Sequence, residues 1–211
     1  MQRALLLDLD GTLADSLQLV RQCYFSYLQR FGATGSMEEF QSLNGPPLAL
    51  VVAKLKQAHA LPGSQSELLN SYRQEIALQY RQVQPMAGAL TLVTQAHEKG
   101  WSIGVVTSNQ RSIIQPWLAR HQIWPMVATL VCGEDVQHGK PHPEPYLTAL
   151  GQLHCEASQS LAVEDSPQGA SAATAAGVAT WGVGFSTDAP PDGWPPVAGF
   201  IPGLEALLPW L

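Results

Sequence analysis

The sequence is poor in basic residues and has no long hydrophobic run. It has 11 Lys and Arg against 17 Asp and Glu, a net charge of −6, and no basic cluster. Binding to nucleic acid or to an anionic membrane requires clustered positive charge, so we expect neither as a partner. No apolar stretch is as long as a membrane-spanning helix, and the first residues lack the charged-then-apolar pattern of a signal peptide.

Cysteine is also scarce. The sequence has an odd number of cysteines, and they lie far apart: Cys23, Cys132 and Cys155. This usage fits buried thiols in a reducing compartment and argues against a disulfide framework, so we expect a cytoplasmic protein. The chain is nevertheless rich enough in apolar residues to bury a sizeable core, since 45% of its 211 residues are hydrophobic.

Short apolar runs alternate with helical patterns over most of the chain. Runs of this length that end at turn residues are typical of buried parallel strands. Their alternation with helices predicts an α/β fold with a Rossmann-like parallel sheet core and helices on both faces. The expected strands are residues 4–7, 101–106, 127–131, 160–163 and 179–183.

Residues 16–84 interrupt this alternation, because they contain helical patterns only. Asp15 and Ser16 can cap the first of these helices. We therefore expect two domains: an α/β core formed by residues 1–15 and 85–211, and an all-helical domain inserted after the first strand. Near the other end, four prolines between positions 190 and 196 predict a surface loop, followed by a short helix over 203–208.

Polar side chains follow several of the expected strands. In a parallel sheet the carboxyl ends of the strands meet at one edge, where α/β proteins bind ligands. Paired carboxylates there can bind Mg²⁺, act as a nucleophile or exchange protons. Taken singly, each group also has an ordinary interpretation as a solvated turn, a helix cap or a surface lysine. The candidates are Asp8, Asp10, Thr107, Ser108, Asn109, Lys140, Glu164 and Asp165.

Four motifs together resemble the haloacid dehalogenase-like hydrolase superfamily, in the branch of phosphoglycolate phosphatases and β-phosphoglucomutases. They cover most of the chain, and the helical insert is similar to the cap domain of that branch. The motifs are Asp8-Leu9-Asp10-Gly11-Thr12-Leu13, Val106-Thr107-Ser108-Asn109, Gly139-Lys140-Pro141-His142-Pro143-Glu144-Pro145-Tyr146, and Val163-Glu164-Asp165-Ser166-Pro167 with Gly169.

The resemblance implies a role for each candidate at the strand ends. Asp8 would be the nucleophile that forms an aspartyl-phosphate, and Asp10 would be the general acid and base. Thr107, Ser108 and Asn109 would form the phosphate-binding segment, together with Lys140. The resemblance also implies a Mg²⁺ cofactor held by Asp8, Asp10 and Asp165, with Glu164 as a second or water-mediated ligand.

We therefore expect a Mg²⁺-dependent phosphatase that acts on a small phosphorylated metabolite, as a monomer or homodimer. Alternatives are a β-phosphoglucomutase-like phosphosugar mutase and a non-catalytic binding protein on the same fold. Leu48 stands about where related mutases carry an arginine, and the loop 43–48 has no basic residue, which favours a phosphatase. We interpret the spacing of His138 and His142 as a loop feature without a metal, and the pair Tyr72-Arg73 as structural.

Overall fold

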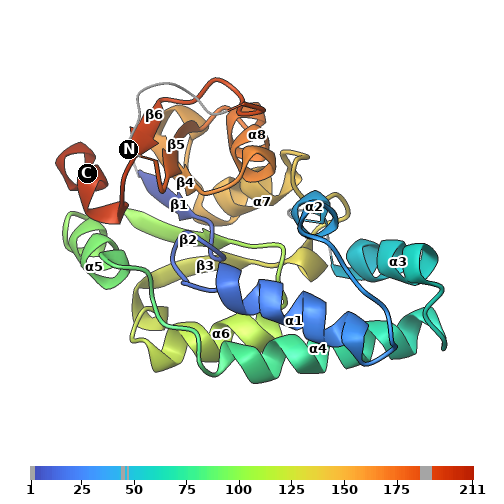
Figure 1. The fold of residues 1–211 in the computed structure, drawn as a ribbon. Coiled ribbons are helices and arrows are strands. Elements are labelled where there is room, and N and C mark those ends of the chain that lie inside the picture. Colours follow the sequence, from blue (N-terminus) through green and yellow to red (C-terminus); the bar gives the residue numbers. More distant parts are fainter. Residues whose placement is uncertain (1–2, 44–45, 47, 186–191) are drawn as a thin grey trace.

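The computed structural model describes residues 3–43, 46, 48–185 and 192–211. Their centre is a six-stranded parallel sheet with the order β3-β2-β1-β4-β5-β6, and helices cover both faces (Figure 1). The predicted α/β fold is therefore confirmed. The strands are β1 (Ala4–Leu7), β2 (Ser102–Val106), β3 (Val127–Val131), β4 (Ser160–Glu164), β5 (Ala179–Val183) and β6 (Gly199–Ile201).

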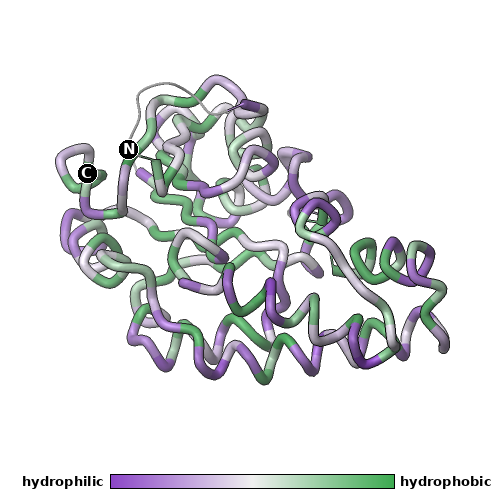
Figure 2. Tube along the Cα trace, in the orientation of Figure 1, coloured by the Kyte–Doolittle hydropathy of each residue, from purple (hydrophilic) through white to green (hydrophobic). Residues whose placement is uncertain are grey.

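The central strand β1 shows why both faces of the sheet are covered. All four of its side chains are fully buried. Because successive side chains point to opposite faces, Leu5 and Leu7 join one hydrophobic cluster while Ala4 and Leu6 join the other. Figure 2 shows the resulting concentration of hydrophobic residues in the strands at the centre of the molecule.

The helices that cover the two faces are amphipathic. On one face, α7 (Glu144–Leu153) packs against β1, β2 and β3, and α8 (Pro167–Ala175) packs against β4 and β5. The other face contributes Leu5, Leu7 and Ile103 to a cluster that also contains side chains of α5 (Ala89–Glu98) and α6 (Arg111–Arg120). Short 3-10 turns lie at 124–126, 133–135, 157–159 and 204–210.

Between β1 and α5 the chain forms four helices and no strand among its described residues. They are α1 (Leu17–Gln29), α2 (Met37–Ser42), α3 (Leu48–His59) and α4 (Gln65–Tyr80). We call α1–α4 the helical insert. Helix α4 packs against both α1 and α3. The two connections to the core pair with each other, because Asp15 N donates to Gln84 O over 2.9 Å and Met86 N donates to Leu13 O over 2.8 Å.

Near the end of the chain the structure contains one strand that was not expected. Residues 179–183 are not the last strand, because β6 pairs in parallel with β5 at the edge of the sheet. The three-residue strand is too short to give a periodic pattern, and nearby prolines obscured it. The short helix expected over 203–208 is confirmed and is a 3-10 helix, Leu204–Trp210. Of the proline-rich segment, Pro190 and Pro191 lie outside the described residues.

No helix within the described ranges is long and apolar enough to cross a membrane.

Candidate active site

The sheet brings the predicted candidates together at one edge. Asp8 follows β1, Thr107 follows β2, and Glu164 ends β4 immediately before Asp165. Lys140 arrives from the loop between β3 and α7. A single pocket is lined by seven of the eight candidates, and Glu164 lies directly behind it, bonded to Lys140. The seven are Asp8, Asp10, Thr107, Ser108, Asn109, Lys140 and Asp165.

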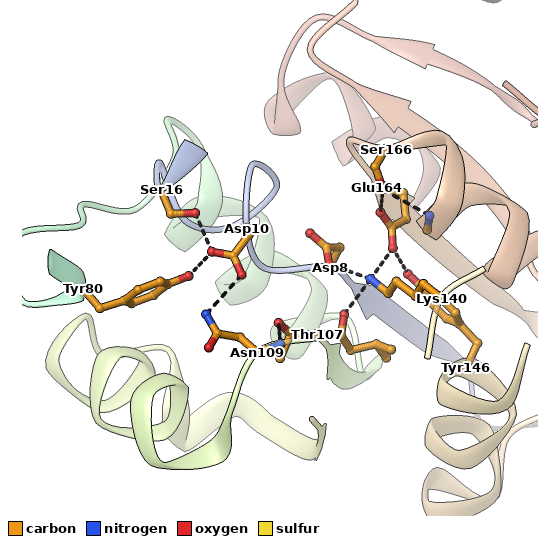
Figure 3. A network of polar contacts seen from close by, with 12 residues as sticks. Asp8, Asp10, Ser16, Tyr80, Thr107, Asn109, Lys140, Tyr146, Glu164 and Ser166 are labelled. Atoms are coloured by element: carbon orange, nitrogen blue, oxygen red, sulfur yellow. Dashed lines mark hydrogen bonds and ion pairs between the residues drawn. The ribbon is translucent and has the colours of Figure 1, made fainter. Parts of the chain in front are cut away.

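Lys140 is the centre of a buried charge network (Figure 3). Its Nζ donates to Asp8 Oδ1 over 2.6 Å, to Glu164 Oε1 over 2.5 Å and to the carbonyl oxygen of Val106 over 3.0 Å. Only 5% of Lys140 is exposed and Glu164 is fully buried. Burial alone would lower the pKa of the Lys140 ammonium, but the two carboxylates raise it above its usual value, so Lys140 remains charged.

Glu164 anchors this lysine from behind. Its Oε1 also accepts a hydrogen bond from the Tyr146 hydroxyl over 2.5 Å, and Oε2 accepts one from Ser166 over 3.4 Å. Burial raises the pKa of Glu164 to about 7, although Lys140 opposes the shift. Glu164 was expected as a second or water-mediated metal ligand. Its closest contacts are Lys140 and Tyr146, so it holds the lysine, and its carboxylate also lies near those of Asp8 and Asp165.

Asp10 lies on the other side of the pocket and is held by a separate set of hydrogen bonds. The Tyr80 hydroxyl and the Ser16 hydroxyl both donate to Oδ1, the latter over 2.6 Å. Asn109 Nδ2 donates to Oδ2 over 3.5 Å. Burial raises the pKa of Asp10, while the bonds from Ser16 and Tyr80 oppose that shift. A carboxyl group with a raised pKa is suited to donate and accept a proton near neutral pH.

Ser16 therefore has a different role from the one expected. It occupies the N-cap position of α1, but its side chain makes no capping hydrogen bond. The hydroxyl is directed to Asp10 instead. Tyr80 and Tyr146 were not identified as site residues by the sequence analysis. Tyr80 lies within residues 16–84, where the helical pattern alone gave no sign of its contact with Asp10.

The segment after β2 forms a turn at the pocket. Thr107 Oγ1 accepts the backbone N–H of Asn109 over 3.0 Å, and Asn109 Oδ1 accepts the N–H of Gln110 over 2.8 Å. Helix α6 then begins at Arg111. The N-cap residue of α6 is Gln110. The alternative interpretation of Thr107, Ser108 or Asn109 as the cap of this helix therefore does not hold. These hydrogen bonds fix Thr107 and Asn109 just before the N-terminus of α6, a position that favours the binding of an anion.

A divalent cation fits the acidic side of the pocket. Carboxylate oxygens of Asp8, Glu164 and Asp165 lie within 4.8 Å of one another. Burial and the neighbouring Asp8 and Glu164 charges raise the pKa of Asp165 well above its usual value, which indicates a shortage of positive charge. Gly11 makes room for Asp165, since a Cβ at Gly11 would lie 2.2 Å from Asp165 Oδ2. Oxygen ligands of this kind suit Mg²⁺.

The remaining expectations concern residues away from this network. His138 and His142 lie in an exposed loop, where Glu144 Oε2 accepts from His138 Nδ1 over 2.9 Å. Tyr72 lines the pocket, whereas Arg73 is not among the lining residues. In the loop 43–48, Leu43, Pro46 and Leu48 line the pocket, and Asn44, Gly45 and Pro47 lie outside the described residues.

Comparisons with known proteins agree with this geometry. A curated relative, validoxylamine A 7'-phosphate phosphatase of Streptomyces hygroscopicus, is 30% identical over 90% of this chain and 89% of its own. Pyrophosphatase PpaX of Oceanobacillus iheyensis is 26% identical over 87% of this chain and 84% of its own. These names confirm the expectation of a hydrolase that acts on phosphoryl groups.

Solved structures share the fold. CbbY from Rhodobacter sphaeroides, in complex with phosphate, superposes with a TM-score of 0.85 at 21% identity and covers 98% of this chain and 96% of its own. The family model for haloacid dehalogenase-like hydrolases matches residues 5–183, a range that includes all eight candidates. The chain therefore belongs to the haloacid dehalogenase-like hydrolase family.

Proposed function

We propose that this protein is a Mg²⁺-dependent phosphatase that hydrolyses a small phosphorylated metabolite through an aspartyl-phosphate on Asp8. The observation that carries the proposal is the arrangement of the two aspartates. Asp8 is bonded to a fixed ammonium group, whereas Asp10 is bonded to hydroxyl and amide groups. The two carboxylates follow the same strand, yet their different surroundings suit them to different chemical roles.

In the first step, a carboxylate oxygen of Asp8 attacks phosphorus and the bond to the leaving oxygen breaks. Asp10, whose pKa is raised by burial, supplies the proton that this oxygen needs. Lys140 holds Asp8 in position and balances negative charge beside the transferred group. Thr107 lines the pocket next to Asp8 and orients the phosphoryl oxygens through its hydroxyl.

In the second step, Asp10 acts as a base. It takes a proton from water, which attacks the aspartyl-phosphate, and Asp8 is released together with inorganic phosphate. When bound, Mg²⁺ would neutralise charge and align the phosphoryl group. Asp8, Asp165 and the main-chain carbonyl of Asp10 would hold it, with Glu164 as a more distant or water-mediated ligand. The helical insert, together with its connections to the core, forms the domain expected over residues 16–84 and serves as a cap that excludes bulk water.

A mutase reaction is the second candidate, since β-phosphoglucomutases share this fold. A mutase must also hold a second phosphate, and the pocket wall on the insert has no basic side chain among its described residues. The test is to follow β-glucose 1-phosphate with Mg²⁺ and a trace of the 1,6-bisphosphate. Released phosphate agrees with a phosphatase. No reaction agrees with a phosphatase that acts on a different substrate. Rapid formation of glucose 6-phosphate without phosphate release would overturn the proposal.

A further inference from the structure

The part of the pocket formed by the helical insert differs sharply in character from the part formed by the core. The core contributes carboxylates, a lysine, hydroxyls and an amide. The insert contributes a wall of apolar side chains from α1, from α3 and α4, and from the chain around the end of α2. Its principal members are Leu17, Phe40, Leu43, Leu48, Val51 and Ile76. Figure 1 shows these helices adjoining the carboxyl edge of the sheet.

The two tyrosines on this wall add little polarity to it. The hydroxyl of Tyr24 is engaged inside the insert, where it bonds to the Glu39 carboxylate and accepts the Ser36 N–H over 3.1 Å. Glu39 is itself paired with His59 over 2.9 Å. The Tyr72 hydroxyl makes no hydrogen bond to any of the described residues. Burial raises the pKa of Tyr72, so that the hydroxyl stays protonated and can donate one hydrogen bond.

The charges that do line the pocket leave no place for a second anion. Lys140 is the one basic side chain among the described lining residues, and its ammonium is already bonded to Asp8 and Glu164. The other charged lining residues are acidic: Asp8, Asp10 and Asp165, all from the core. A carboxylate or second phosphate on the substrate would therefore sit against apolar carbon with no cation to pair with, which is costly.

We infer that the substrate is a phosphate monoester whose alcohol part is uncharged and largely apolar, and that this part lies on the insert wall. The pocket has a volume of about 150 Å³ and must hold the transferred phosphoryl group as well, which favours a compact alcohol part. The Tyr72 hydroxyl provides one hydrogen bond for a single polar atom. This inference rests on the proposed phosphatase function and narrows its substrate class.

Matched substrates of equal size test the inference. Acetol phosphate differs from phosphoglycolate in carrying a methyl group where phosphoglycolate carries a carboxylate oxygen. The second pair is 4-acetylbenzyl phosphate and 4-carboxybenzyl phosphate. With Mg²⁺ present, kcat/KM should be higher for the uncharged member of each pair, by about tenfold or more, since the charged group meets an apolar wall. Equal or reversed values would overturn the inference and leave the phosphatase proposal standing.

A cation placed on the wall supplies the second arm. Leu48 lies at the start of α3, is only partly buried and lines the pocket. Leu48→Arg should shift the acetol phosphate to phosphoglycolate ratio of kcat/KM toward phosphoglycolate by about tenfold, the scale of one charge-assisted contact. Leu50→Arg is the matched control, because Leu50 lies on the same helix, is 49% exposed and does not line the pocket.

The ratio is measured within each variant, so the amount of folded protein does not affect it. A ratio that is unchanged in Leu48→Arg, or that shifts equally in Leu50→Arg, would contradict the placement of the alcohol part on this wall. If none of the four esters releases phosphate, nor any other phosphate monoester tested, the phosphatase proposal itself fails and the inference with it.

Discussion

The hydroxyl of Tyr80 donates a hydrogen bond to Oδ1 of Asp10, and this contact joins the last residue of the helical insert to the carboxylate that follows β1. Ser16, the residue just before the insert begins, donates to the same oxygen. Asp10 is thus bonded at both connections between the insert and the core. The orientation of the proposed general acid and base therefore depends on how the insert sits on the sheet.

Tyr80→Phe tests this dependence. The ring and its packing on Trp117 are kept, while the hydrogen bond to Asp10 is lost. We expect kcat to fall by about 10- to 100-fold, a part of the usual contribution of general acid–base catalysis. The bond from Tyr80 lowers the pKa of Asp10, so its loss should raise that pKa further. Because the first step needs protonated Asp10, the alkaline limb of the kcat/KM profile should move to higher pH.

Tyr27→Phe is the matched control for that experiment. The Tyr27 hydroxyl donates to the carbonyl oxygen of Leu68 over 2.9 Å, entirely within the insert. This variant should lose stability and keep the position of the alkaline limb. A Tyr80→Phe profile that overlays the wild type, with unchanged kcat, would show that Tyr80 does not position Asp10.

Lys140→Met should destabilise the fold as well as stop turnover. Without the ammonium group, Asp8 and Glu164 would face each other as buried carboxylates with no balancing charge. Removing one partner of a buried ion pair costs about 3–5 kcal/mol in the free energy of unfolding. Urea denaturation measures this loss, which should shrink at acid pH as the carboxylates take up protons. Lys54→Met, at an exposed position of α3, should leave the unfolding midpoint unchanged; an equal loss there would refute the explanation.

Gly169→Ala should disturb the lysine anchor. A Cβ at Gly169 would lie 2.0 Å from Glu164 Oε2, closer than real contacts allow. Either Glu164 or α8 must move, and we expect a loss of about 1–3 kcal/mol in the free energy of unfolding, typical of overpacking. Gly151→Ala in α7 is the control, because nothing lies within 4 Å of its Cβ. It should stabilise the protein by up to about 1 kcal/mol through helix propensity, and a loss of similar size in both variants would argue against the specific clash.

The metal-free protein should become less stable as the pH rises. The pKa values of Asp10 and Asp165 are raised by burial, and that of Glu164 is raised to about 7. The folded state therefore binds protons more tightly than the unfolded state does, and this stability is lost as the pH rises through about 7. In EDTA, we expect Tm to fall between about pH 5 and 8.

Added Mg²⁺ should raise Tm more at the upper end of that range, because it competes with protons for the carboxylates. Asp165→Asn should flatten the metal-free dependence and reduce the gain from Mg²⁺. A Tm in EDTA that stays constant or rises over this range would contradict the raised pKa values of these carboxyl groups.

The edge of the sheet that carries the candidate site could be predicted from the sequence, because its residues follow the ends of strands. The run Ala4–Leu7 is continuous, apolar and fully buried, so its end and the aspartates after it were identifiable. The same rule located Thr107 and Glu164. Pairing in a parallel sheet then brings these strand ends together without further information.

Contacts that depend on tertiary packing could not be predicted in this way. Tyr80 donates a hydrogen bond to Asp10, which lies 70 positions earlier in the sequence. Tyr146 donates one to Glu164 from helix α7. Both tyrosines occupy apolar positions of amphipathic helices, and the hydrophobic pattern does not show which residue a tyrosine hydroxyl contacts. Strand β6 was not predicted for another reason: three residues are too few to establish a hydrophobic period.

The central claim is that Asp8 is the nucleophile, and Asp8→Asn tests it most directly. The substitution keeps the shape of the side chain and removes its charge, whereas Asp15→Asn makes the same change at an exposed position nearby. Phosphate release with Mg²⁺ should fall at least about a thousandfold in Asp8→Asn, the scale of an essential covalent residue, and stay near wild type in Asp15→Asn. An Asp8→Asn enzyme that is folded and retains more than about a tenth of wild-type turnover would contradict the claim.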